Sequence, residues 1–561
     1  MSTRYPSLKQ ITRNIVIIFI LLIVLLHPTG VARAADFTAG TSYQLDQAIY
    51  DANQNSGADT ITLTASITLT DTLDAITTQI TIEGGGYTLS GGGTRQVLTV
   101  SETGNLTVNN ITIANGATSS RGAGISNEGT LTATNSTFSG NVATGVSAVG
   151  GAIFNEGTVQ YPARLYIDNC TFSGNSSRRA GGIVNYNIDS TATINNSTFS
   201  NNTASVDGGA LRNNGTMTIN NSTITGNSAG TSGGGIVNYG ILTIYRNIIS
   251  GNSGPTSGAE IYNHFTITPI TSGYNVVGYN GLTTSAAYSG YTPSGTGDYN
   301  ATSDANNKSL AEILTTLANN GGPTQTFALP SGSPAIDRAP NNNCTPPSPT
   351  NGIDQRGAAR NYDVNGTDTD CDSGAVEFRS PTQNCTLSIN TPITIENVTF
   401  NFSSLGPGPL GCVTVEEMGP GANHLISTGT GPDGETLETG NWWYITGDNI
   451  GFTTSISLTY NLADADTRVC KWPGGLGGSG WDCGNSLNTS SVAGVSVTRS
   501  GITSFSDWTV GQGVGPTAVT LFNINVGSSL PWVSAGLAIG VLAAGLLLTL
   551  WQVKIRKQAH G

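Results

Sequence analysis

A seven-residue phrase recurs through the middle of the chain at a nearly constant interval, and this rhythm restricts the folds that the chain can adopt. Residues 135–141 read Asn-Ser-Thr-Phe-Ser-Gly-Asn. Copies of the phrase, the last one weaker, start at Asn110, Asn135, Asn169, Asn196, Asn221 and Arg246, in steps of 25, 34, 27, 25 and 25 residues. Such a period is typical of stacked coils, each of which contacts only its neighbours.

Alternating apolar residues within each copy predict short strands with one inward face. Equivalent positions in successive copies include Phe138, Phe172 and Phe199, and one coil alone cannot bury such a face. Stacking would place the strands of successive coils side by side and parallel, about 4.8 Å apart. The sequence therefore predicts a parallel β-helix, right-handed because parallel crossovers nearly always are.

Asparagine recurs at two further positions of every coil, and we interpret both columns as structural ladders at corners rather than as ligand sites. Asn tolerates left-handed backbone, bonds to its own turn, and can bond from coil to coil when stacked. One column is Asn141, Asn175, Asn202, Asn227 and Asn252, and the other is Asn127, Asn155, Asn185, Asn213, Asn238 and Asn263.

The long step of 34 residues marks an insertion in one coil. Its places are Val142 to Val149 and Thr158 to Arg164. Loops that leave one face of a solenoid often carry binding. The sequence thus points weakly to this coil as a place for ligand contact.

Composition limits the function classes. The chain of 561 residues has 10% charged residues, 74 glycines and a net charge of −13. Nucleic acid is excluded as a partner, because phosphate binding needs a basic face. The acidic balance serves solubility.

Both ends of the chain carry apolar segments, one typical of a signal peptide and one of a membrane anchor. Arg4, Lys9 and Arg13 precede an apolar run, and Ala32-Arg33-Ala34 fits a cleavage site, so residues 1–34 are predicted to be a signal peptide. Residues 532–553 fit a transmembrane helix, and the basic tail 554–561 would lie inside, with the repeats outside. We therefore expect a single-pass membrane protein of the cell surface.

Seven cysteines suit an oxidising compartment. Six follow the repeats, and sequence neighbours make the simplest pairs, although six cysteines allow 15 pairings. These pairs are Cys344–Cys371, Cys385–Cys412 and Cys470–Cys483. Cys170 takes the Ser position of the repeat, which predicts a buried, unreactive thiol.

Two sequence patterns resemble those of exported bacterial proteins. Phe-x-x-Asn with Gly-Gly-Ala-Ile resembles the repeat of chlamydial polymorphic outer-membrane proteins and, more broadly, exported right-handed β-helix proteins. The run from Asn320 to Glu377, with Asp337, Asp354 and Arg356, resembles the choice-of-anchor Q module that follows such β-helices. From these acidic and basic residues we expect a salt-bridge network that closes the helix end, with a catalytic carboxylate pair as the alternative.

The predicted architecture is all-β: a parallel β-helix, a small β-sandwich and one membrane helix. A short amphipathic helix should cap the first coil, because Leu45, Ala48 and Ile49 have helical spacing. The boundaries are 1–34 signal peptide, 35–290 β-helix with its cap at about 41–53, 291–380 helix-end module, 381–515 disulfide-stapled β-sandwich, 516–531 linker, 532–553 transmembrane helix and 554–561 tail.

An acidic loop offers one candidate metal site. Asp363, Asn365, Asp368 and Asp370 alternate around Gly366, which suits Ca²⁺. The spacing differs from that of an EF-hand, and an acidic surface turn is the favoured interpretation. No other cofactor is expected.

The function predicted from sequence is adhesive or structural, and the alternative is a β-helix carbohydrate-active enzyme, a polysaccharide lyase or glycoside hydrolase. Arg179 and Asp207 are expected to pair in adjacent coils, but one pair does not make a catalytic site. His264 and His424 stand isolated, so no triad or zinc cluster is indicated. The expected partners are the membrane and a polysaccharide or other surface ligand, and no catalytic residue is assigned.

Overall fold

The computed structural model describes residues 34–255, 257–264, 270–340, 352–358, 360 and 370–378, together with strand segments between 382 and 512. The predicted signal peptide and transmembrane helix lie outside these ranges. No helix among the described residues is long and apolar enough to cross a bilayer.

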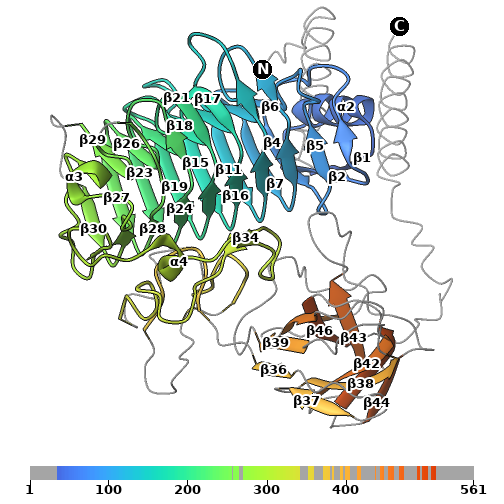
Figure 1. Ribbon diagram of the computed structural model, residues 1–561. Coiled ribbons are helices and arrows are strands. Elements are labelled where there is room, and N and C mark those ends of the chain that lie inside the picture. The colour runs from blue at the N-terminus through green and yellow to red at the C-terminus, as the bar shows by residue number, and fades with distance from the viewer. Residues whose placement is uncertain are drawn as a thin grey trace, which may run out of the picture. The chain divides into compact units, whose positions relative to one another are not determined.

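The repeats form a parallel β-solenoid, which confirms the all-β class and the stacked coils (Figure 1). Every strand of one coil pairs in parallel with its equivalent in the next, in four sheets that we name A to D. Sheet A contains β1 (Asp36–Ala39), β2 (Asp59–Leu63), β4 (Gln79–Glu83), β7 (Asn105–Asn109), β11 (Thr130–Thr134), β15 (Arg164–Asp168), β19 (Thr191–Asn195), β23 (Thr216–Asn220), β27 (Ile241–Tyr245) and β30 (Thr271–Gly273). The right-handed sense of the coil stays a prediction.

Sheet B follows A in each coil, and the two other sheets complete the circuit. Sheet B contains β3 (Ile67–Thr68), β5 (Thr88–Ser90), β8 (Thr112–Ala114), β12 (Thr137–Ser139), β16 (Thr171–Ser173), β20 (Thr198–Ser200), β24 (Thr223–Thr225), β28 (Ile248–Ile249), β31 (Val276–Val277) and β33 (Tyr299–Asn300). Sheet D, the short one, contains β9 (Ala117–Thr118), β13 (Val142–Ala143), β17 (Ser176–Arg179), β21 (Thr203–Asp207) and β25 (Ser228–Ala229). Sheet C contains β6 (Leu98–Val100), β10 (Ile125–Asn127), β14 (Ile153–Asn155), β18 (Ile183–Asn185), β22 (Leu211–Asn213), β26 (Ile236–Asn238), β29 (Ile261–Asn263) and β32 (Tyr288–Ser289).

The core is a set of columns that run along the solenoid axis. Phe138, Phe172 and Phe199 stack with ring centroids 4.6 Å apart and nearly parallel planes. Leu165 and Ile183 are also buried, as predicted from their alternation with polar residues. Identical side chains at strand spacing give continuous apolar contact, so the coils stabilise one another.

Two elements close the ends of the stack. Helix α2 (Ser42–Asn53) buries Leu45, Ala48 and Ile49 and lies beside β1 and β2, at the end where the first coil would otherwise expose its core (Figure 1). Thr41 accepts a hydrogen bond from the Gln44 amide and so caps its N-terminus. At the other end lies the short helix α3 (Thr284–Ala287).

A segment after the last coil returns along the side of the solenoid. It carries α4 (Leu310–Ile313) and the antiparallel pair β34 (Leu317–Ala318) and β35 (Thr326–Phe327). Its described residues reach back to β16, β20 and β24 through polar contacts, so residues 320–378 cover part of the outer face of sheet B. The segment was expected to close the end of the helix; instead it also packs laterally across several coils.

The strands beyond residue 381 form two antiparallel sheets. One contains β36 (Thr382–Asn384), β39 (Val413–Glu417), β40 (Thr436–Leu437), β41 (Trp443–Gly447), β43 (Thr467–Trp472) and β46 (Asp507–Gln512). The other contains β37 (Ile393–Ile395), β38 (Val398–Ser404), β42 (Thr453–Thr459), β44 (Thr489–Val492) and β45 (Ser496–Ile502). Their packing as a sandwich stays a prediction.

Candidate binding surface

The predicted asparagine columns lie inside the solenoid, where they bond from coil to coil. In the first column the side-chain amide of each Asn donates to the next carbonyl oxygen at 2.8–2.9 Å, from Asn141 to Asn252. The second column does the same from Asn127 to Asn263 at 2.6–2.9 Å. All these amides are buried, so they hold the coils and do not face a ligand.

Left-handed backbone falls on different asparagines from those in the ladders. Positive φ occurs at the first residue of the phrase, as in Asn135 (φ 52°) and Asn196 (φ 43°), at the corner between sheets A and B. The ladder residues Asn141 and Asn202 have no positive φ. The sequence assigns the left-handed turn and the coil-to-coil hydrogen bond to the same asparagine, but in the structure they belong to two different ones. The αL residue turns the chain at the corner, while the ladder residue must point its amide inward.

The described cysteines are Cys170 and Cys371, together with the backbone of Cys470. Cys170 is free and fully buried, and burial raises the pKa of its thiol to about 12, so it stays protonated and unreactive. Cys371 is disulfide-bonded. Its predicted partner Cys344, the pair Cys385–Cys412, Cys483 and the side chain of Cys470 lie outside the described residues.

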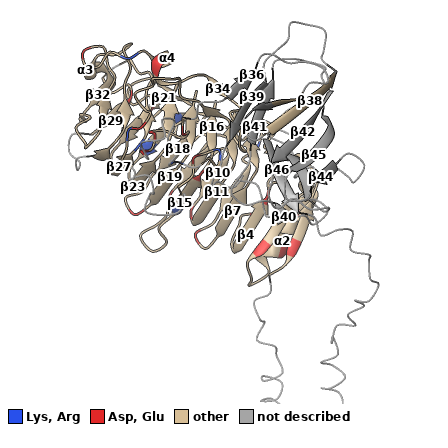
Figure 2. Ribbon diagram, turned by 90° about the horizontal axis from the view of Figure 1, so that it is seen from below, with Lys and Arg blue, Asp and Glu red and all other residues tan. Residues whose placement is uncertain are grey.

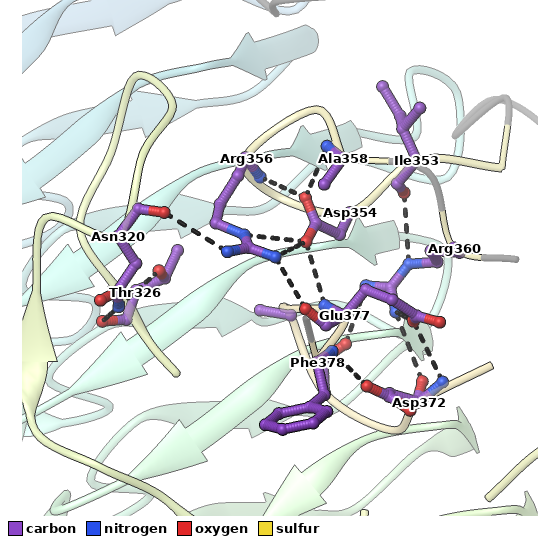
Figure 3. A network of polar contacts seen from close by, with 12 residues as sticks. Asn320, Thr326, Ile353, Asp354, Arg356, Ala358, Arg360, Asp372, Glu377 and Phe378 are labelled. Atoms are coloured by element: carbon purple, nitrogen blue, oxygen red, sulfur yellow. Dashed lines mark hydrogen bonds and ion pairs between the residues drawn. The ribbon is translucent and has the colours of Figure 1, made fainter. Parts of the chain in front are cut away.

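The predicted salt-bridge residues form a buried network between the lateral segment and sheet B (Figure 3). Arg356 pairs with Asp354 at 2.9 Å and donates to the Glu377 carbonyl at 2.7 Å. Arg360, which the sequence did not single out, contacts the Glu377 carboxylate at 3.6 Å and donates to Asn196 of the solenoid at 3.1 Å. The network therefore joins the segment to the coils.

Burial argues against a catalytic role for this network. Asp372 and Glu377 are almost completely buried, and desolvation raises the pKa of Asp372 to about 7 and that of Glu377 well above its usual value. Asp337, also named from sequence, donates its backbone N–H to Asp372 at 2.8 Å. A general acid must reach substrate within hydrogen-bond distance, and these carboxyls instead hold turns together.

The candidate calcium loop lies mostly outside the described residues. Of its four proposed ligands only Asp370 is described, while Asp363, Asn365 and Asp368 are not. Within the described ranges no group of three or more His, Cys, Asp or Glu side chains gathers as a metal site.

The coil with the long step builds an open groove on the outer face of sheet D. Its volume is about 490 Å³, within the range of small-ligand sites. The insertion contributes Thr144, Gly145 and the exposed Val146, while the next coils contribute hydroxyls and one guanidinium. The lining residues are Val142, Ala143, Thr144, Gly145, Val146, Ser176, Ser177, Arg178, Thr203 and Ser205.

The second insertion in the same coil carries exposed apolar side chains. Val159, Tyr161 and Tyr166 belong to this coil, and Tyr186 and Ile188 to the next one. Tyr186 lies against Phe154, with ring centroids 5.6 Å apart. With Val146 of the groove, six of the exposed large apolar residues of the described chain thus come from two neighbouring coils.

Aromatic and charged side chains contact one another along sheet C and at the turns that follow its strands. Asp207 pairs with Arg212 at 2.7 Å, whose guanidinium lies 4.4 Å from the Tyr239 ring centre; Tyr239 also contacts His264. The expected pairing of Arg179 with Asp207 is wrong: the two are register partners, but Arg212, five residues beyond Asp207, takes the carboxylate.

The sequence did not point to Arg212 or Tyr239, and His264, which it presents as isolated, lies against the Tyr239 ring with centroids 5.2 Å apart. Tyr239 and His264 each directly follow a ladder asparagine, Asn238 and Asn263, so they share one column at the end of the sheet C strands. This column could have been found from the sequence, because residues that follow the recurring ladder asparagine stack from coil to coil.

Comparison with known proteins gives one match. A family model described as a pectate lyase-like adhesive domain matches residues 45–144, from α2 to the start of the long coil. No curated protein and no solved structure matches the chain.

Proposed function

We propose that the protein is a cell-surface adhesive that binds its ligand over the long coil without turning it over. The observation that carries the proposal is the open groove on sheet D, which the irregular coil helps to line, together with the exposed side chains of Tyr161, Tyr166 and Tyr186 on that coil and the next one. Similarity of residues 45–144 to an adhesive domain supports the same role. Ligand sites on solenoids commonly lie where loops leave the regular stack.

A binding role suits the distribution of charge on the solenoid. Figure 2 shows few charged residues along the strands of the stack, with acidic residues on loops and on α2. The acidic side chains that do gather, Asp354, Asp372 and Glu377, are enclosed by the lateral segment. Glycoside hydrolysis needs two carboxyls that flank an accessible bond, and this buried set does not provide them.

We propose further that the protein is exported and held by one membrane helix. The supports are the signal-like residues 1–34, the apolar run 532–553 and the basic residues that follow it. The solenoid would then stand outside the cell, where oxidising conditions suit the disulfide of Cys371.

The test uses the exported portion, residues 35–529, on a glycan array and on whole cells. Retention of a ligand with no release of unsaturated or reducing sugar supports the proposal. Release of such sugars from a polysaccharide panel would instead identify the protein as a polysaccharide lyase or glycoside hydrolase. Binding by a variant with Val146→Asp and Tyr186→Ala should fall, since both residues are exposed on the surface of the long coil and its neighbour.

A further inference from the structure

The groove on sheet D contains a cation that no acid of the described chain neutralises. Arg178 lines the groove together with the hydroxyls of Thr144, Ser176, Thr203 and Ser205. Within the described ranges Arg178 makes no ion pair or side-chain hydrogen bond. The groove is therefore locally positive, although the chain as a whole has a net charge of −13.

The neighbouring acids are already engaged. Asp207 lies one coil beyond, and Arg212 holds its carboxylate in a buried pair; both side chains are more than nine-tenths buried. Glu156 is paired with Arg121. The positive charge at this place is therefore not cancelled from either side.

We infer that the groove binds an anionic group, a carboxylate or a sulfate ester, carried by a polysaccharide. The inference rests on the proposed adhesive function and names the ligand class of the same site. Arg178 presents the planar donor fork that matches such anions in two-point contact. The groove hydroxyls can donate to and accept from the sugar hydroxyls around the anion, and its volume suits one or two sugar rings.

Full-length protein in detergent, tested against three polymers, decides the inference. The probes are alginate, which carries carboxylates, dextran sulfate, which carries sulfate esters, and neutral dextran. We expect binding to at least one of the two anionic polymers, weakened by salt because the contact is electrostatic, and no binding to dextran. Which of the two binds identifies the anion.

Arg178→Gln and Lys308→Gln make a matched pair of variants. Both remove one half-exposed cation, but Lys308 lies just before α4, outside the groove and outside the long coil. Arg178→Gln should weaken binding to the anionic polymer about tenfold or more, and Lys308→Gln by less than about twofold. Arg178→Lys should fall between wild type and Arg178→Gln, since lysine keeps the charge and loses the fork.

Three results would overturn the inference: equal binding to dextran, no binding to either anionic polymer, or equal effects of the two glutamine variants. Adhesion to cells in the presence of any of these results would leave the proposed function standing with a different ligand. Loss of cell and glycan binding altogether would instead remove the proposed function.

Discussion

The carboxylate of Glu260 accepts a 2.6 Å hydrogen bond from the side-chain amide of Asn252, the last asparagine of the first ladder. The other carboxylate oxygen accepts the Gly251 N–H at 2.8 Å. Each earlier ladder amide donates to an asparagine of the next coil and also to a carbonyl of the preceding coil. Asn252 keeps the second of these bonds, to the Ile224 carbonyl at 2.8 Å, and without Glu260 it would have lacked the first. A third, shorter column has the same ending: Asn247 donates to Asn275 at 3.1 Å, and Asn275 donates to the carboxylate of Asp298 at 2.9 Å. Acidic residues thus terminate two rows of amides.

Stability should fall as pH rises from about 4 to about 8. Desolvation raises the pKa of Glu260 to about 8 and those of Asp168 and Asp372 to about 7, above their values of 4.5 and 3.8 in the absence of the fold. A carboxyl group whose pKa is higher in the folded state than in the unfolded state stabilises the fold fully at pH values below its unfolded pKa. This contribution is lost as the pH rises through its folded pKa. Thermal unfolding across pH 4–9 measures this, and a midpoint that rises over that interval would contradict it.

Phe172→Ala should destabilise the solenoid by about 3–5 kcal/mol, because it removes the central ring of a three-ring stack and leaves a cavity. Tyr166→Ala, in the same coil but 43% exposed on the outer face, is the control and should cost less than about 1 kcal/mol. Chemical denaturation of both variants gives the comparison. Similar losses for the two would mean that the aromatic column does not hold the coils.

Two adjacent asparagines should respond differently to replacement by glycine. Asn201 is exposed with φ 55°, a conformation that glycine adopts freely, so Asn201→Gly should change stability by less than about 1 kcal/mol. Asn202 donates to Asn227 and to the Phe172 carbonyl at 2.9 Å, so Asn202→Gly leaves several buried groups unpaired and should cost about 3 kcal/mol or more. Equal unfolding midpoints for the two variants would refute the ladder role.

Arg360→Met should release the lateral segment while the coils stay folded. The change strips Glu377 of its cationic partner and Asn196 of a donor, and an unpaired buried charge costs about 3–5 kcal/mol. Hydrogen exchange should rise at residues 352–358 and 370–378 and stay low in β11, β15 and β19. Arg164→Met, on the outer face of sheet A, is the control; uniform exchange across the whole chain would show instead that the segment is needed for the solenoid to fold.

Calcium binding to the loop at 363–370 stays a prediction, and a calcium titration of thermal stability tests it. If the loop binds Ca²⁺, the midpoint should rise with calcium in the wild type and not in Asp368→Ala. A shift of equal size in both proteins would rule the loop out.

The sequence predicts the regular part of this fold well because the same physics acts at every coil. Phe138 and Phe172 share a position in the phrase, and the structure stacks them; Leu45 and Ile49 have helical spacing, and α2 buries both. Prediction weakens where contacts are not periodic. Nothing in the spacing shows that Gln355 bonds to Thr198 at 2.7 Å across 157 residues, which places the lateral segment on sheet B.

The candidate site shows the same division. The long step locates the groove, since Val142 to Val149 supplies half of its lining. The partner of Asp207 could not be read from the coil register, because Arg179 is its strand neighbour while Arg212 reaches it across a turn. Side-chain reach around a corner depends on backbone geometry that a repeat pattern does not encode.

The asparagine-to-asparagine hydrogen bonds of both ladders all run in one direction: each side-chain amide donates to the asparagine of the coil that follows it in the chain. A chain that emerges N-terminus first therefore ends, at every moment, in a coil whose ladder amides still lack their acceptor in the next coil. Only the next coil supplies these acceptors, so the folded stack would grow one coil at a time from the N-terminal end. Glu260 ends the first ladder, because its carboxylate accepts the hydrogen bond from Asn252 that a further coil would otherwise have to accept.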